Sequence, residues 1–126
     1  MFRYLWPDWE AEVRRLTDGL GADLAVDVVG PATLNDTLKA IRHGGRISLM
    51  GVLTGFGGPI DTGAILEKRI TLQGIYVGSV AALRALSQVK ITPQIDCIFP
   101  FENADAAFGS LRRANHFGKL VVQIGH

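Results

Sequence analysis

The segment 23–52, DLAVDVVGPATLNDTLKAIRHGGRISLMGV, constrains the fold of this chain more than any other. An apolar run at Leu24–Val29 ends at Gly30, an amphipathic stretch follows, and a second apolar run occupies Arg46–Val52. Such runs are typical of strands covered on both faces, and two of them joined by a helix form a parallel pair with a right-handed crossover. The segment therefore predicts a strand, a helix and a second parallel strand, with ligands bound at the carboxyl ends of the strands.

The linking stretch is predicted to be a helix that begins at Pro31 and ends before Gly44-Gly45. Leu34, Leu38 and Ile41 form its buried stripe. Arg42 and His43 are expected near its carboxyl end, where positive charge is favourable.

Asp27 interrupts the first apolar run. One interpretation is that its carboxylate caps a neighbouring backbone segment or faces solvent at the strand end. The alternative is that it contacts a ligand hydroxyl, and nothing in the sequence favours that alternative.

The rest of the chain continues the α/β pattern. Periodicity and turn residues predict these further elements: a helix with Trp9, Val13 and Leu16 on one face, a short helix within 63–68, a strand over 70–77, a helix after Ser79 with Leu83, Leu86 and Val89 on one face, a strand over 94–99, a helix that buries Ala107, Phe108 and Leu111, and a strand over 119–124.

Composition excludes several classes of function. Thirteen basic residues against twelve acidic ones give a net charge of +1, with no basic stripe, so neither nucleic-acid nor anionic-membrane binding is expected. No apolar run reaches the length of a membrane span, and the amino terminus lacks the features of a secretory signal. One cysteine, Cys97, excludes an internal disulfide and fits a reducing compartment. We therefore expect one cytoplasmic domain over residues 1–126.

The motifs that announce a ligand are missing. Neither G-x-G-x-x-G nor G-x-x-x-x-G-K-[ST] occurs, and no G-x-S-x-G marks a nucleophile. The segment 55–58, Gly-Phe-Gly-Gly, is interpreted as a turn because Pro59 follows it. His43, His116 and His126 are scattered without metal-ligand spacing, so the residues by themselves identify neither a metal site nor a catalytic group.

Four ordered runs, DWEAEVRRLTDGLGADLAVDVVG, TLNDTLKAIRHGGRISLMGV, ILEKRITLQGIYVGS and FPFENADAAFGSLRRANHFGKLVVQI, resemble the C-terminal part of a medium-chain dehydrogenase/reductase. Within that superfamily they are most similar to zinc-binding alcohol dehydrogenase-like and quinone oxidoreductase-like enzymes. The resemblance implies a partial Rossmann-like parallel sheet with flanking helices, lacking the Gly-rich first strand–helix unit. Residues 8–90 would be the second half of the Rossmann domain, and residues 91–126 would return to a catalytic domain absent here. Zinc ligands of the family come from that absent part, so no zinc is expected.

The resemblance also implies contacts with NAD or NADP. Each matching segment has a simpler interpretation as strand packing or turn chemistry. The matching positions are Val29 and Gly30 beside the adenosine ribose, Gly51, Val52 and Leu53 under the nicotinamide, Tyr76, Val77 and Gly78 at the end of the last Rossmann strand, and His116, Phe117, Gly118 and Lys119 in the return segment.

The implied activity is hydride transfer with a carbonyl, alcohol or quinone, although the chain alone is expected to be inactive without the phosphate loop. Two alternatives stay open: a non-catalytic oligomerisation module or truncated remnant, and a domain that binds a different ligand at the strand ends.

The family pattern further implies a homo-oligomer in which the edge strand 70–77 pairs antiparallel with its copy. An exposed apolar edge favours such pairing on physical grounds too. The opposite edge, Leu24–Val29, is expected to be covered by the aromatic segment 1–6 or used in an intermolecular contact.

Overall fold

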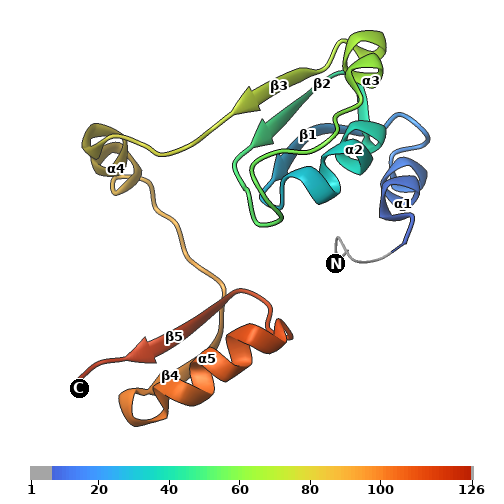
Figure 1. The fold of residues 1–126 in the computed structure, drawn as a ribbon. Coiled ribbons are helices and arrows are strands. Elements are labelled where there is room, and N and C mark those ends of the chain that lie inside the picture. The colour runs from blue at the N-terminus through green and yellow to red at the C-terminus, as the bar shows by residue number, and fades with distance from the viewer. Residues whose placement is uncertain (1–6, 126) are drawn as a thin grey trace. The chain divides into compact units, whose positions relative to one another are not determined.

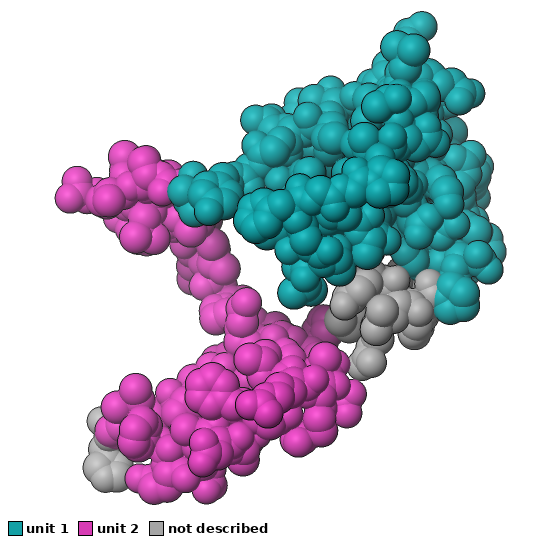
Figure 2. All heavy atoms as spheres, viewed as in Figure 1, with its two compact units in different colours: residues 1–77 teal, residues 78–126 magenta. Residues whose placement is uncertain are grey.

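In the computed structural model, which describes residues 7–125, the chain forms two compact units, Met1–Val77 and Gly78–His126 (Figures 1 and 2). The predicted covering segment 1–6 and His126 lie outside the described residues. None of the helices in the described range combines the length and apolar character needed to cross a membrane.

The first unit contains a three-stranded parallel sheet in the order β1-β2-β3 (Figure 1). Its first crossover is the predicted strand–helix–strand unit, because one helix connects two neighbouring parallel strands. The elements of this unit are α1 Trp9–Leu16, β1 Ala22–Asp27, α2 Pro31–Ala40, β2 Ile41–Leu49, α3 Thr62–Lys68 and β3 Thr71–Gly74.

The core of this unit lies between one face of the sheet and the helices α2 and α3. Leu38, Ile41 and Ile47 are fully buried there, and Leu34 and Ile70 complete the cluster. The predicted burial of Leu34, Leu38 and Ile41 is therefore confirmed, but only the two leucines lie in α2, since Ile41 is the first residue of β2.

The other face of β1 is exposed. Leu24 and Val26 of β1, and Val28 just after it, each expose more than half of their surface, so the prediction of a strand covered on both faces is wrong for the described residues. The residues of β1 that are covered are Ala22 and Ala25, which pack against the core, and Asp27, which is buried. At the open edge of β1, a groove of about 420 Å³ is lined in part by Trp9 and Val13 of α1.

The α2–β2 junction differs from the prediction. The helix ends at Ala40, and Ile41 already has extended backbone, so Arg42 and His43 lie in β2 and not at the helix end. Ala22 pairs with Ile41 and Leu24 with Arg46, which shows a shift in register at this point. The Gly44-Gly45 pair thus accommodates an irregularity in the strand and does not terminate the helix.

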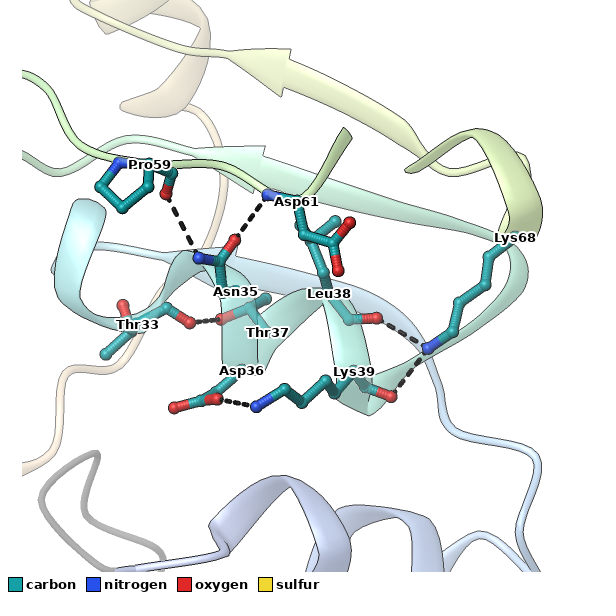
Figure 3. A network of polar contacts seen from close by, with 9 residues as sticks. All are labelled: Thr33, Asn35, Asp36, Thr37, Leu38, Lys39, Pro59, Asp61 and Lys68. Carbon is teal, nitrogen blue, oxygen red and sulfur yellow. Dashed lines mark hydrogen bonds and ion pairs between the residues drawn. The ribbon is translucent and has the colours of Figure 1, made fainter. Parts of the chain in front are cut away.

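A lysine from a distant helix supplies the positive charge at the end of α2. Lys68 Nζ donates to the carbonyl oxygens of Leu38 at 2.8 Å and Lys39 at 2.9 Å (Figure 3). It also donates to the carbonyl oxygen of Ile41 at 3.0 Å. Burial, together with the nearby charge of Arg14, lowers the pKa of Lys68. This cap links α3 to α2 and fixes the junction from which β2 begins.

The second unit is smaller and more open. β4 and β5 form a two-stranded parallel sheet, which α5 contacts. Ala107 is buried, but Phe108 and Leu111 are exposed, so their predicted burial is wrong in this structure. Leu83, Leu86 and Val89 are exposed as well, because two strands and one packed helix offer little interior. The elements of the second unit are α4 Val80–Leu86, β4 Ile95–Pro100, the 3₁₀ turn Phe101–Asn103, α5 Ala104–Arg113 and β5 Lys119–Gln123.

Candidate functional site

A small cleft of about 170 Å³ lies at the carboxyl ends of β1 and β2. Three of the residues singled out in the sequence, Gly30, Gly51 and Val52, line it together. No charged side chain is among its lining residues, which leaves backbone and apolar groups facing the cleft. The other lining residues are Pro31, Leu34, Leu49, Gly55, Phe56, Gly57, Gly58, Pro59 and Ile60.

Close backbone approach explains two glycines of the cleft. A Cβ atom on Gly51 would overlap the carbonyl group of Val28. Gly30 has a φ of +92°, and a Cβ there would lie 2.7 Å from the carbonyl oxygen of Gly51. The two strand ends therefore meet at a spacing that only glycine permits.

A buried carboxylate lies beneath the β1–α2 turn. Asp27 is 4% exposed, and its Oδ1 accepts hydrogen bonds from the backbone N–H groups of Val29 at 3.0 Å and Gly30 at 2.9 Å. The hydroxyls of Thr33 and Thr37 also donate to it. The interpretation of Asp27 as a backbone cap is confirmed, whereas its exposure to solvent is excluded.

The first turn of α2 has little capacity left for an anion. The Ala32 N–H donates to Thr54 Oγ1 at 3.1 Å, and the N–H groups of Thr33 and Leu34 donate to the Gly30 carbonyl. Pro31 has no N–H to offer. A phosphate at this helix end would also lie near the Asp27 carboxylate. The cleft therefore suits an uncharged group better than a phosphate.

The loop after β2 is held against the β1–α2 turn. The backbone N–H and the hydroxyl of Thr54 both donate to the Val29 carbonyl at 3.1 Å. Further along, Asn35 Nδ2 donates to the Pro59 carbonyl at 3.2 Å and Asn35 Oδ1 accepts from the Asp61 N–H at 2.9 Å (Figure 3). Segment 55–58, interpreted as a simple turn, thus forms one wall of the cleft. The sequence signal for this role was the position of the segment directly after Gly51–Leu53, which were already predicted to contact the cofactor.

The remaining predicted contact residues are not brought into this cleft. Leu53, Tyr76 and Val77 are exposed in the first unit, and Leu53 does not line the cleft. Val29 is buried, with its carbonyl accepting from Thr54. Gly78 begins the second unit.

The predicted return segment, 116–119, lies wholly in the second unit. The Phe117 N–H donates to Asp96 Oδ1 at 3.2 Å and the Lys119 N–H to the Gln94 carbonyl at 2.8 Å. His116, Gly118 and Lys119 line a pocket of about 370 Å³ beside α5 and β5. The His116 Nδ1 atom is buried there without a hydrogen-bond partner among the described residues.

Comparison with known proteins places the chain in a family. The zinc-binding dehydrogenase family model matches residues 3–90. The chain is 29% identical to a zinc-type alcohol dehydrogenase-like protein of Schizosaccharomyces pombe and 25% identical to quinone oxidoreductase-like protein 2 of Rattus norvegicus, over 94% and 89% of its own length. It superposes on a crystal structure of an NAD-dependent alcohol dehydrogenase with a TM-score of 0.74 and 33% identity over 97% of the chain.

The chain spans only about a third of the length of these proteins: 36% of each of the two relatives and 37% of the crystal structure. The structural match confirms the predicted Rossmann-like α/β fold. The family model covers well over half of the chain and agrees with the resemblance seen in the sequence. The chain therefore belongs to the zinc-binding dehydrogenase family and corresponds to the carboxyl-terminal part of longer medium-chain dehydrogenases/reductases.

Proposed function

We propose that this chain is the dinucleotide-binding part of an NAD(P)-dependent oxidoreductase that transfers a hydride to or from a carbonyl, alcohol or quinone. The observation that carries the proposal is the uncharged cleft formed by Gly30, Gly51 and Val52 at the carboxyl ends of two parallel strands. Ligands of open parallel sheets bind at such strand ends. Membership of a dehydrogenase family supports the same activity.

The lining of the cleft fits a nicotinamide ring. The ring is planar and uncharged in its reduced form, and the cleft offers apolar side chains and backbone rather than ionic groups. Gly51 and Val52, with Leu53 beside them, would hold the ring, and Val29 and Gly30 would lie by the adenosine ribose. The bound dinucleotide would supply or accept the hydride, according to the direction of the reaction, while these residues orient it and exclude water.

The remaining contacts belong to the same proposal. Tyr76, Val77 and Gly78 would complete the nicotinamide side, and residues 116–119 would approach the dinucleotide from the return segment. Residues 8–90 would then be the second half of a Rossmann domain. The pyrophosphate would need a loop that the sequence does not contain, so we expect no turnover by this chain alone.

Calorimetric titration of the chain with NADH and with NADPH tests the proposal. We expect saturable binding of at least one of them. Val52→Asp should weaken that binding by about tenfold, because it places a charge in an uncharged cleft. Val52 is 45% exposed, so the fold should tolerate the change.

Val89→Asp is the matched control, since Val89 is 57% exposed and lies in the other unit. It should bind as the unmodified chain does. Equal affinity of the Val52→Asp variant and the unmodified chain would contradict the proposed cleft. Absence of binding by the unmodified chain would favour a non-catalytic module.

The second proposal concerns self-association through the edge segment 70–77. Within the described sheet β3 is an edge strand, shorter than the predicted 70–77, and Ile75, Tyr76 and Val77, which follow it, are exposed. We expect sedimentation velocity to detect a dimer at micromolar concentration. Ile75→Lys should give a monomer because lysine on an edge opposes strand pairing, and Leu66→Lys on α3 should leave the dimer intact. A monomeric unmodified chain would refute this assembly.

A further inference from the structure

Asp27 reaches both segments that form the cleft. It is the last residue of β1, and its Oδ1 accepts from the N–H groups of Val29 and Gly30. Its main-chain oxygen accepts from the N–H groups of Met50 at 2.9 Å and Gly51 at 3.2 Å. One residue therefore holds the β1–α2 turn through its side chain and the end of β2 through its backbone.

The carboxylate has no capacity left for a ligand. In addition to the two N–H groups that donate to Oδ1, Thr33 Oγ1 lies 3.0 Å from both carboxylate oxygens and shares its single hydrogen between them, and Thr37 Oγ1 donates to Oδ2 at 2.9 Å. Both threonines are themselves buried. These contacts contradict the alternative raised from the sequence, in which Asp27 contacts a ligand hydroxyl.

We infer that Asp27 is a positioning residue for the strand-end cleft: it sets the place of Gly30 relative to Gly51 without touching the bound molecule. A Cβ on Gly30 would lie 2.7 Å from the Gly51 carbonyl oxygen, so a small shift of the turn alters the cleft. The inference rests on the proposed function in taking that molecule to be NADH or NADPH. A small displacement of positioning groups can lower binding or turnover strongly.

Three substitutions in the full chain separate positioning from simple stabilisation. Asp27→Asn keeps the shape and an oxygen for the Val29 and Gly30 N–H groups. Asp27→Glu keeps the charge but moves the carboxylate by one methylene. Thr37→Val removes a hydroxyl that donates to Oδ2, away from the turn. If the glutamate variant does not fold, Asp27→Ala takes its place, because it too removes the carboxylate oxygen that accepts from the Val29 and Gly30 N–H groups.

We expect Asp27→Glu to weaken dinucleotide binding in calorimetry by about tenfold or more, which corresponds to one charge-assisted hydrogen bond. Asp27→Asn should bind within about threefold of the unmodified chain, since it retains the two backbone contacts. Thr37→Val should lower the melting temperature and leave the affinity unchanged. Unchanged affinity of the Asp27→Glu variant would overturn the inference, and so would an equal loss of affinity in the Thr37→Val variant.

Amide hydrogen exchange gives a readout that needs no ligand. Asp27→Glu should accelerate exchange at Val29 and Gly30 beyond the average of the first unit, and Thr37→Val should not. If the unmodified chain binds neither dinucleotide, the proposed function fails, and the exchange data alone decide whether Asp27 fixes the turn. Uniform acceleration of amide exchange across the first unit would mean that Asp27 contributes only to overall stability.

Discussion

Gly51→Ala is expected to destabilise the first unit by about 3 kcal/mol or more, which is enough to unfold much of a small marginal domain. The new methyl group would overlap the main-chain carbonyl of Val28. Because the clash is with backbone rather than with the end of a flexible side chain, it can be relieved only if β1 and β2 separate at their carboxyl ends. Chemical denaturation followed by circular dichroism measures the loss.

Gly57→Ala is the matched control for this substitution. Gly57 lies in the loop of the same cleft, and no heavy atom is within 4 Å of a Cβ built on it. We expect its unfolding free energy to change by no more than about 0.5 kcal/mol, as for an ordinary surface change. If both variants were equally stable, the two strand ends would not approach each other as closely as described.

Leu38→Ala is expected to cost about 2–5 kcal/mol of unfolding free energy. Leu38 is 0% exposed and packs in the cluster with Ile41, Ile47 and Ile70 between α2 and the sheet. Truncation removes buried methyl groups and leaves a cavity that the surrounding side chains fill only in part. The midpoint of urea unfolding should fall accordingly.

The control is Leu66→Ala on α3, because Leu66 is 81% exposed and loses little contact. Its unfolding free energy should stay within about 0.5 kcal/mol of that of the unmodified chain. A similar loss in both variants would mean that the described core does not carry the stability of this unit.

Several features of the site could be predicted from the sequence because they depend on short-range pattern. Apolar runs that end in glycine located the carboxyl ends of two parallel strands, and with them Gly30, Gly51 and Val52. The loop 55–60 was not recognised as a wall, since glycine and proline carry no periodicity that reports on a neighbouring segment. The contacts of Asn35 with Pro59 and Asp61 join residues more than twenty positions apart.

The errors have a common physical origin. Hydrophobicity predicted burial for Val26, Val28, Phe108 and Leu111, but burial requires a second surface to pack against, and the described residues leave these side chains exposed. The end of α2 gives a second example of a contact that depends on a distant segment. The sequence placed Arg42 and His43 there, whereas tertiary packing brings Lys68 from α3.

By itself the sequence determined the α/β class, the parallel strand–helix–strand unit, the family resemblance and the glycines at the strand ends. Tertiary structure alone decided which groups meet at those ends. It buried Asp27 against two threonines of α2 and placed Gly51 against the Val28 carbonyl. Local periodicity fixes which face a side chain takes, but the distance between two segments is set only when the strands pair and the helix packs across them.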